Sequence, residues 1–425
     1  MPPHKGDPYQ SSVSGAPEAL QDANCQWGML RVLIAMRLLH TSDWHLGRSF
    51  HREDLLGAQA AFADHLLETV RDERVDCVLV SGDVYDRALP PVDAVRLYDE
   101  TLRRLAAVTR VVLISGNHDS AVRLGVGSGL LDLAGVYVRT SPESVGEPVV
   151  LGDVAIYPIP YLEPDFVRGK WDLRERSHAA ALSEAMRRIA SDRTPGARVV
   201  LAHAFVTSGN AEPVVSESER NIAVGGVEMV PVRVFDGVAY TALGHLHGRQ
   251  QVSERVRYSG SPLAYSFSEE HQVKGSWLVD VDAGGLRDAA FVEAPVPRPI
   301  ARVRGTLADL LSDPRYDYFT KHWLKVTLTD AKRPAGAMER LRARFPHALV
   351  LGFEPSAVTE GERSWAERVK ERSGVDLACD FLAEVGGEDA APEERALLED
   401  AFTHCRQEER ARVPAPRAGD RRTPR

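Results

Sequence analysis

The sequence has few thiols, no excess of positive charge and no long apolar run, and each absence excludes a class of protein. Its four cysteines (Cys25, Cys77, Cys379, Cys405) are far apart and form no CxxC pair. Thiolate zinc sites and a disulfide framework are therefore not expected, and a reducing cytoplasm is the expected location. The formal net charge is −9, so any binding to nucleic acid must depend on local basic patches, bound metal or a partner.

The first apolar stretch, from Met29 to Met36, contains Arg31 and is too short to span a membrane. No clear signal-peptide cleavage site follows it. Residues 1–35 are rich in Pro, Gly, Ser and Gln without a period, and we expect a disordered extension there. Because strand-like sequence begins directly after Met36, our hypothesis is that translation starts at that methionine. Mass spectrometry of the native N-terminus tests this, and a peptide from residues 1–28 would contradict it.

The whole chain has the composition of a soluble protein with two or three units, since 44% of its 425 residues are hydrophobic and 27% are charged. Short apolar runs at 38–39, 78–80 and 111–114 alternate with helical periodicity at 59–74 and 92–108. This β-α-β-α-β order predicts parallel strands with helices on the faces of the sheet. One layered α/β domain is therefore expected over residues 36–292.

Three further segments are expected after a proline-rich linker at 295–299. Residues 300–355 alternate strand and helix patterns, which indicates a small α+β unit. Residues 370–405 are acidic and fit two amphipathic helices, at 375–385 and 392–405. Residues 406–425 are rich in Arg and Pro and are expected to form a disordered basic tail.

Five apolar strands in the first domain end at residue types that bind metal ions. Individually, such residues are more often caps, turns or hydrogen-bonded core histidines, but five coincidences at strand ends are improbable. Carboxylate, imidazole and amide groups suit Mn, Fe or Zn, and the carboxyl ends of strands are where ligands gather in α/β sheets. The segments are Asp43-Trp44-His45, Gly82-Asp83, Gly116-Asn117-His118-Asp119, Ala202-His203 and Gly244-His245-Leu246-His247.

This donor set predicts a two-ion phosphoesterase centre. Two ions ~3.5–4 Å apart can share a hydroxide and clamp phosphoryl oxygens, and Asp83 is the candidate bridging carboxylate. Asn117 offers a neutral oxygen. His118 is expected to face the substrate, where it would stabilise transition-state charge or protonate the leaving oxygen. Asp119 either orients His118 or caps the turn, and the two interpretations are equally open.

The same five segments are the signature of the calcineurin-like metallophosphoesterase superfamily. Longer stretches resemble the SbcD family, the nuclease subunit of the bacterial SbcCD complex, and the resemblance extends from Met36 to Cys405. The stretches that carry it are Leu38 to Arg48, Ser81 to Asp86, Ser216 to Gly226 and Tyr258 to Glu269.

The resemblance implies two divalent ions, preferably Mn²⁺, and a site for each. One ion would be held by Asp43, His45, Asp83 and His247, and the other by Asp83, Asn117, His203 and His245. His118 matches the catalytic histidine of the family, which is not a ligand. Where archaeal relatives have a further histidine this chain has Asp86, so a strand-positioning role there is not carried over.

The resemblance also implies a 3′→5′ exonuclease on double-strand ends and an endonuclease on single strands and hairpins. Such enzymes process DNA for repair, recombination and replication with an SbcC-type coiled-coil ATPase, in the cytoplasm at the nucleoid. A homodimer within a heterotetramer is implied, formed through helices of the nuclease domain. A helical stripe that either contributes to this dimer or packs in the core comprises Val95, Tyr98, Leu102 and Leu105.

The C-terminal segments have matching expectations. Residues 300–355 resemble a capping domain that positions DNA, with phosphate contacts or a solvated helix face offered by Lys332, Arg333, Arg340, Arg342 and Arg344. The helix pair resembles the segment that docks on the coiled coil of the ATPase; the alternative is a hairpin folded back on the cap. Its apolar residues are Leu377, Phe381, Leu382, Val385, Leu397, Leu398 and Phe402.

Two other functions stay open on the metal motifs alone. A phosphatase or phosphodiesterase for small substrates would need neither cap nor helix pair, so the sequence from Ile300 to Cys405 argues against it. A scaffold without catalysis would not need His118 and a complete set of ligand residues. The DNA nuclease is therefore the preferred interpretation.

Overall fold

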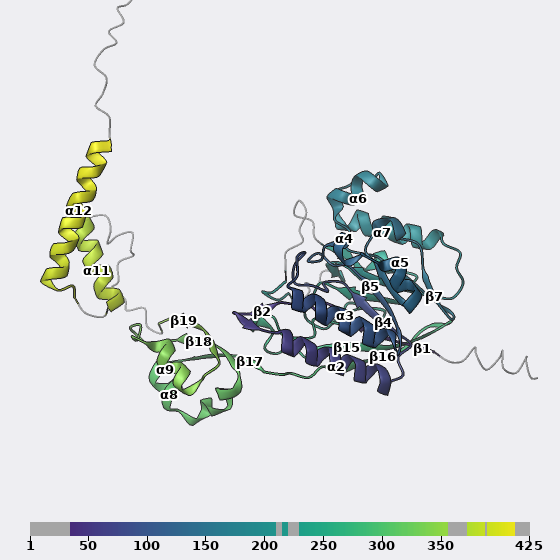
Figure 1. Cartoon of the computed structure of the whole chain (residues 1–425), viewed down its shortest axis with the longest axis horizontal. Coiled ribbons are helices and arrows are strands. Elements are labelled where there is room, and N and C mark those ends of the chain that lie inside the picture. Colours follow the sequence, from purple (N-terminus) through teal and green to yellow (C-terminus); the bar gives the residue numbers. More distant parts are fainter. Residues whose placement is uncertain (1–34, 210–214, 220–228, 356–371, 387–388, 413–425) are drawn as a thin grey trace, which may run out of the picture. The chain divides into compact units, whose positions relative to one another are not determined.

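A computed structural model describes residues 35–209, 215–219, 229–355, 372–386 and 389–412 (Figure 1). The chain divides into two compact units, Met1–Ile300 and Ala301–Arg425. Among the described residues no helix combines the length and apolar character needed to cross a membrane. The expectations for residues 1–34, for Gly225 and Gly226 and for the tail after residue 412 lie outside the described residues.

The first unit contains a six-stranded sheet in the order β16-β15-β1-β4-β5-β6. The four strands β1, β4, β5 and β6 are parallel, whereas β15 pairs antiparallel with β1 and with β16. The predicted β-α-β-α-β order is thus confirmed for β1, β4 and β5. The bounds are β1 Met36–Thr41, β4 Cys77–Ser81, β5 Arg110–Ile114, β6 Val136–Arg139, β15 Gly275–Asp282 and β16 Gly285–Glu293.

A second six-stranded sheet has the order β13-β14-β12-β9-β8-β7. Its central strands β8, β9, β12 and β14 are parallel, and the outer strands β7 and β13 are antiparallel to their neighbours. The bounds are β7 Val149–Leu151, β8 Val154–Pro158, β9 Ala197–His203, β12 Tyr240–Gly244, β13 Gln250–Gln251 and β14 Val256–Tyr258.

Both faces of each sheet are buried, because side chains that alternate along the strands pack into a core on each side. Leu38 of β1 lies in the core between the two sheets, together with Val199 of β9. The next residue, Leu39, shares a core with residues of helices α2 (Leu56–Asp72) and α3 (Val92–Ala106). Because successive strand side chains point to opposite faces, near-continuous apolar strands are what a sheet covered on both sides requires.

The second sheet is covered in the same way. Helices α6 (Pro164–Trp171) and α7 (His178–Ser191) pack on its outer face, where Ala181 and Ile189 share a core with Val200 of β9. The unit is therefore a helix–sheet–sheet–helix sandwich. This architecture is the layered α/β sandwich that the sequence predicts.

Short strands and helices connect these layers. A two-residue hairpin of β2 (Ser49–Phe50) and β3 (Glu53–Asp54) follows β1, and β10 (Val206–Thr207) pairs in parallel with β11 (Val230–Pro231). The short helices are α4 Ala121–Leu124, α5 Ser128–Leu131, η2 Asp132–Ala134, η3 Pro142–Ser144, η4 Val232–Phe235 and η5 Phe267–Glu269.

The second unit has a three-stranded sheet in the order β17-β18-β19, with its own core around Leu310, Val326, Leu341 and Phe345. Its elements are β17 Ile300–Gly305, α8 Leu307–Ser312, η6 Pro314–Lys321, β18 Trp323–Leu328, α9 Ala337–Arg344 and β19 Ala348–Phe353. Two helices that contact each other follow, α11 (Gly374–Gly386) and α12 (Pro392–Arg412).

Candidate metal centre

The five candidate segments meet where the carboxyl ends of parallel strands from both sheets converge. Asp43, Asp83 and Asn117 follow the adjacent strands β1, β4 and β5, while His203 ends β9 and His245 follows β12. Two contacts join the sheets at this edge. Ser81 Oγ donates to the Ala242 carbonyl at 2.9 Å, and His203 Nδ1 donates to the Ser81 carbonyl at 2.9 Å.

Glycines before the candidate ligands allow the segments of the centre to approach one another closely. A Cβ atom at Gly116 would lie 2.1 Å from Asp83 Oδ1, and one at Gly244 would lie 2.0 Å from the Ser81 carbonyl oxygen. Both contacts are too short for any side chain. Glycine at these positions is therefore required for the segments to meet.

Four of the candidate residues have positive φ angles although they are not glycine: Asp43 (54°), His45 (45°), Asp83 (49°) and His245 (110°). This backbone is unfavourable for residues with a Cβ atom and is typical of functional sites. Backbone hydrogen bonds hold two of them in place, since the amides of Asp43 and His45 donate to the carbonyls of Gly82 and Asp83 at 3.0 Å.

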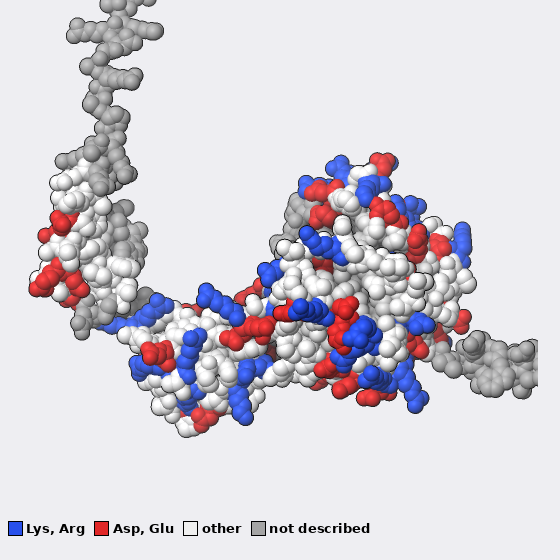
Figure 2. Space-filling model, viewed as in Figure 1, with Lys and Arg blue, Asp and Glu red and all other residues white. Residues whose placement is uncertain are grey.

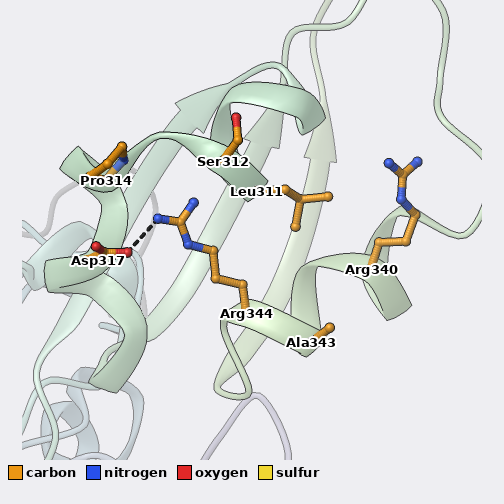
Figure 3. Close-up of a pocket in the computed structure, with 7 residues that line it drawn as sticks. All are labelled: Leu311, Ser312, Pro314, Asp317, Arg340, Ala343 and Arg344. Carbon is orange, nitrogen blue, oxygen red and sulfur yellow. Dashed lines mark hydrogen bonds and ion pairs between the residues drawn. The ribbon is translucent and has the colours of Figure 1, made fainter.

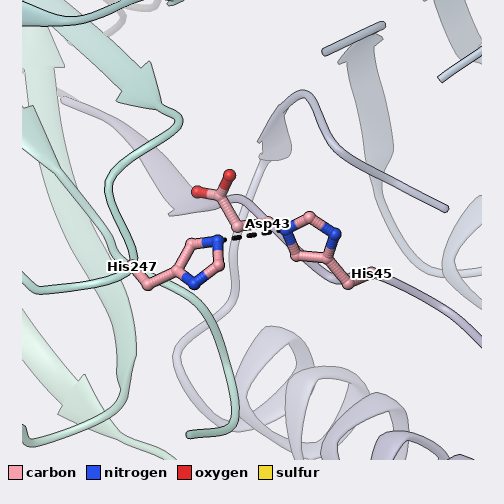
Figure 4. A group of neighbouring side chains, drawn as sticks. All are labelled: Asp43, His45 and His247. Carbon is pink, nitrogen blue, oxygen red and sulfur yellow. Dashed lines mark hydrogen bonds between the residues drawn. The ribbon is translucent and has the colours of Figure 1, made fainter. Parts of the chain in front are cut away.

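Asp43, His45 and His247 form the first group of candidate ligands (Figure 4). His45 Nε2 lies 3.1 Å from His247 Nε2 and 3.6 Å from Asp83 Oδ2. The Asp43 carboxylate is oriented by Ser42 Oγ at 2.5 Å and by the His245 amide at 3.0 Å. All three candidate side chains are buried.

Asn117, His203 and His245 form the second group. Asn117 Oδ1 lies 2.9 Å from His203 Nε2 and 3.3 Å from His245 Nδ1. Asn117 Nδ2 is buried without a hydrogen-bond partner among the described atoms. The amide oxygen is thus directed at two imidazole nitrogens, as expected for three donors that share one cation.

Asp83 lies between the two groups. Its Oδ1 accepts a hydrogen bond from the His118 amide at 2.9 Å, which turns Oδ2 toward the imidazoles. Oδ2 is 3.6 Å from His45 Nε2 and 3.5 Å from His203 Nε2. Two atoms bound at about 2.1 Å to one ion lie roughly 3 to 3.5 Å apart, so the spacing fits an ion on either side of this oxygen.

Burial sets the charge of the centre. It lowers the pKa of His203 and of His247 to about 4, so their imidazoles are neutral at pH 7 and keep a lone pair for a metal. Burial, followed by the charge of Asp83, raises the pKa of Asp43 well above its usual range. Neutral imidazoles beside two buried carboxylates fit a cation-binding site, and divalent ions would favour the charged form of both acids.

His118 lies at the edge of this centre. Its Nδ1 donates to the Asp86 carbonyl at 2.7 Å, which directs Nε2 inward to 4.0 Å from Asp83 Oδ2. His45, Asp83 and His118 also lie close enough together to hold an ion. The geometry alone therefore allows His118 to be a ligand or a proton donor.

The Asp119 carboxylate joins two loops of the centre by hydrogen bonds. It accepts hydrogen bonds from the amides of Val84, Tyr85 and Gly116 at 3.1, 2.9 and 2.9 Å. The His118 ring is instead held by the Asp86 carbonyl. Of the two interpretations of Asp119, the contacts support the turn-capping one.

Sequence reasoning missed the polar residues that surround His247. Ser218 Oγ lies 2.6 Å from His247 Nδ1, Glu219 Oε1 accepts from the His247 amide at 2.7 Å, and Lys274 donates to the His247 carbonyl at 2.9 Å. Ser218, Glu219 and Glu269 fall within stretches that resemble the SbcD family. That likeness was the only signal, because loop residues have no periodicity to indicate burial.

Comparisons with known proteins agree with this geometry. The calcineurin-like phosphoesterase family matches residues 36–249, and an SbcD-type domain described as the type 5 capsule protein repressor C-terminal domain matches residues 296–386.

The solved structures that are similar to this chain include three of low sequence identity. A dimetal phosphatase from Danio rerio is 14% identical (62% of this chain, 100% of that one, TM-score 0.34). Nuclease MPE from Pseudomonas putida is 16% identical (60% and 87%, TM-score 0.23). The GAP50 anchor in the inner membrane complex of Plasmodium is 11% identical (76% and 98%, TM-score 0.35). The two family matches, over residues 36–249 and 296–386, place this chain among the calcineurin-like phosphoesterases as a member of the SbcD family.

Proposed function

We propose that this chain is a Mn²⁺-dependent DNA nuclease with a two-ion centre. It would act as a 3′→5′ exonuclease on double-strand ends and as an endonuclease on single strands and hairpins, in repair, recombination and replication. The two-ion centre rests on the position of Asp83 Oδ2, 3.6 Å from His45 Nε2 on one side and 3.5 Å from His203 Nε2 on the other. The preference for DNA over a small ester rests on the SbcD-type domain matched at residues 296–386.

The side chains would divide the work of phosphodiester hydrolysis. Asp43, His45 and His247 would hold one ion, Asn117, His203 and His245 the other, and Asp83 would bridge them. Bound ions would supply a hydroxide at neutral pH and neutralise charge on the phosphoryl oxygens. His118 Nε2, held by the Asp86 carbonyl at Nδ1, would protonate the leaving oxygen or stabilise transition-state charge.

Degradation of end-labelled linear duplex DNA by the full chain tests this function. We expect cleavage with Mn²⁺ that stops on chelation and returns when Mn²⁺ is restored. A hairpin substrate and a small phosphodiester are assayed in parallel. Cleavage of the small ester alone would favour the phosphatase interpretation, and binding of DNA without any cleavage would favour a scaffold.

The C-terminal unit is proposed to position DNA, and the structure narrows the residues that are suited to this. Arg344 donates to the carbonyls of Leu310 and Asp313 and pairs with Asp317 at 2.6 Å, beside a pocket of about 690 Å³ (Figure 3). Arg342 donates to the Ala348 carbonyl at 3.2 Å. Both arginines thus support the fold of the unit.

Phosphate contacts are better assigned to the exposed Lys332, Arg333 and Arg340. On the face that Figure 2 shows, Lys and Arg are interspersed with Asp and Glu.

The helix pair is proposed to dock on an SbcC-type ATPase. Phe381, Val385 and Leu397 are 56%, 70% and 71% exposed, so α11 and α12 keep apolar side chains that their mutual packing does not cover.

Deletion of residues 370–425 is therefore expected to abolish co-purification with the ATPase, because the apolar surface of the helix pair is lost. The measurement is a pull-down from co-expressed chains. Phe381→Asp with Leu397→Asp should have the same effect in the full chain. A complex that survives both changes would rule out this docking surface.

The proposed homodimer needs an exposed apolar surface, but the predicted helical stripe exposes few of its apolar side chains. Leu102 and Leu105 are buried against the first sheet, Tyr98 packs on the same core, and only Val95 is substantially exposed. An apolar ledge elsewhere is better suited. It consists of Val122, Val126, Leu130 and Leu133, which are 83%, 74%, 75% and 88% exposed on the segment from α4 to η2.

Replacing Leu130 and Leu133 of the apolar ledge with aspartate is expected to convert a dimer into a monomer, because two charges would be buried at the interface. Light scattering after size exclusion gives the mass. Val150→Asp, at a residue 53% exposed on β7, is the matched control and should leave the mass unchanged. A dimer that persists in the double variant would place the interface elsewhere.

A further inference from the structure

A chain of hydrogen bonds connects His247 to a buried carboxylate. Ser218 Oγ lies 2.6 Å from His247 Nδ1 and also 2.6 Å from Glu269 Oε1. Glu269 is 1% exposed and pairs with Lys274 Nζ at 2.5 Å, which keeps the group a carboxylate that can only accept hydrogen bonds. Three segments that are distant in the sequence therefore lie next to one another at the His247 imidazole.

The proton count along this chain fixes the state of the imidazole. A serine hydroxyl has one hydrogen, and Ser218 directs it to Glu269 Oε1 at 2.6 Å, because the ionised carboxylate has no hydrogen of its own to place between the two oxygens. Ser218 Oγ is then an acceptor for His247, so Nδ1 carries the proton. Nε2 is left with a lone pair, and this is the atom that lies 3.1 Å from His45 Nε2.

Lys274 holds both ends of this chain. Its ammonium donates to Glu269 Oε2, to the His247 carbonyl at 2.9 Å and to Ser261 Oγ at 3.0 Å. Lys274 is 6% exposed, so the ion pair is fully enclosed. Buried ion pairs contribute little net stability compared with apolar packing. The position of the pair behind a candidate ligand suggests a role in orientation instead.

We propose that Ser218 and Glu269, with Lys274 as their anchor, are positioning residues that hold His247 in the tautomer and orientation needed to bind a metal ion through Nε2. Metal-bound histidines generally donate their other nitrogen to such a partner, which raises the basicity of the ligand. The inference rests on the proposed function, because it takes His247 to be a metal ligand, and it adds which residues tune that ligand.

The competing explanation is that these hydrogen bonds only fasten the segment Ser216–Glu219 to the sandwich. A comparison with Ser216 distinguishes the two explanations. Its hydroxyl donates to the same Glu269 oxygen, and its amide donates to Glu219 Oε2 at 2.9 Å, so it anchors the segment equally. Among the described residues Ser216 makes no hydrogen bond to His247, whereas Ser218 Oγ lies 2.6 Å from His247 Nδ1.

The test is titration of the metal-free full chain with Mn²⁺ by calorimetry, and electron paramagnetic resonance of the bound ions. Ser218→Ala is expected to weaken one of two Mn²⁺ sites about 10- to 100-fold and leave the other unchanged. Ser218→Thr, which keeps the hydroxyl, should restore the affinity, and the control Ser216→Ala should resemble wild type. Melting temperatures of the metal-free variants report on structure alone and should agree.

Three results would overturn the inference: wild-type affinity in Ser218→Ala, an equal loss in Ser216→Ala, or a loss matched by a lower melting temperature of the metal-free protein. These outcomes leave the proposed function standing, because wild type still binds two ions. A wild-type chain that binds fewer than two Mn²⁺ ions would instead overturn the proposed function together with this inference.

Discussion

Replacing Asp83 with asparagine is expected to cost the protein both metal sites at once. Oδ2 faces His45 on one side and His203 on the other, so a neutral amide there removes the shared charge that offsets repulsion between the ions. Oδ1 can still accept from the His118 amide, which preserves the loop. Mn²⁺ affinity should fall by more than roughly 100-fold, beyond the effect of residues that only support a ligand.

Calorimetric titration and metal analysis after dialysis measure this loss, and nuclease activity should disappear with it. Asp64→Asn is the matched control, because it makes the same chemical change at an exposed carboxylate that pairs with Arg104 on the helical face. The control should bind two ions. An Asp83→Asn protein that keeps one ion at wild-type affinity would show that the two sites do not share this carboxylate.

His118→Ala is expected to lower the rate of DNA cleavage by about 10²- to 10⁴-fold, the usual contribution of a general acid, while both ions stay bound. The reason is that Nε2 faces the centre from its edge, 4.0 Å from Asp83 Oδ2, with Nδ1 committed to the Asp86 carbonyl. Single-turnover cleavage at saturating Mn²⁺ gives the rate, and calorimetry on the same sample counts the ions.

The cleavage rate and the number of bound ions together decide the role of His118. A slow enzyme with two ions supports proton donation, whereas a slow enzyme with one ion would make His118 a ligand, which the proximity of His45 and Asp83 also allows. His65→Ala on α2 serves as the control and should cleave like wild type. Equal rates for His118→Ala and wild type would reject the proposed mechanism.

The α/β sandwich could be predicted because the apolar pattern of its strands is recognisable within each short segment of the sequence. Strands covered on both faces must be apolar at every position, so Leu38 and Leu39, or Val78, Leu79 and Val80, are recognisable as runs. Segments that lack such a run were missed. Helix α8, Leu307–Ser312, is too short to display a helical period, and β16, Gly285–Glu293, lies at the edge of its sheet with mostly half-exposed side chains.

The candidate ligands could be proposed for a related reason. Parallel strands bring their carboxyl ends to one edge, so a residue at the end of a buried strand or just beyond it has a predictable place, as His203 and Asp83 do. Ser218, Glu269 and Lys274 come from loops, and their meeting behind His247 depends on long-range packing. Asp119 was undecided for the same reason, since its partners at Val84 and Tyr85 belong to another loop.

The most direct measurement of the central claim is anomalous diffraction from crystals grown with Mn²⁺. Two peaks are expected about 3.5–4 Å apart, one on either side of Asp83 Oδ2, with His45 and His247 at one ion and Asn117, His203 and His245 at the other. A single peak, or a pair in which Asp83 contacts only one ion, would contradict the two-ion centre.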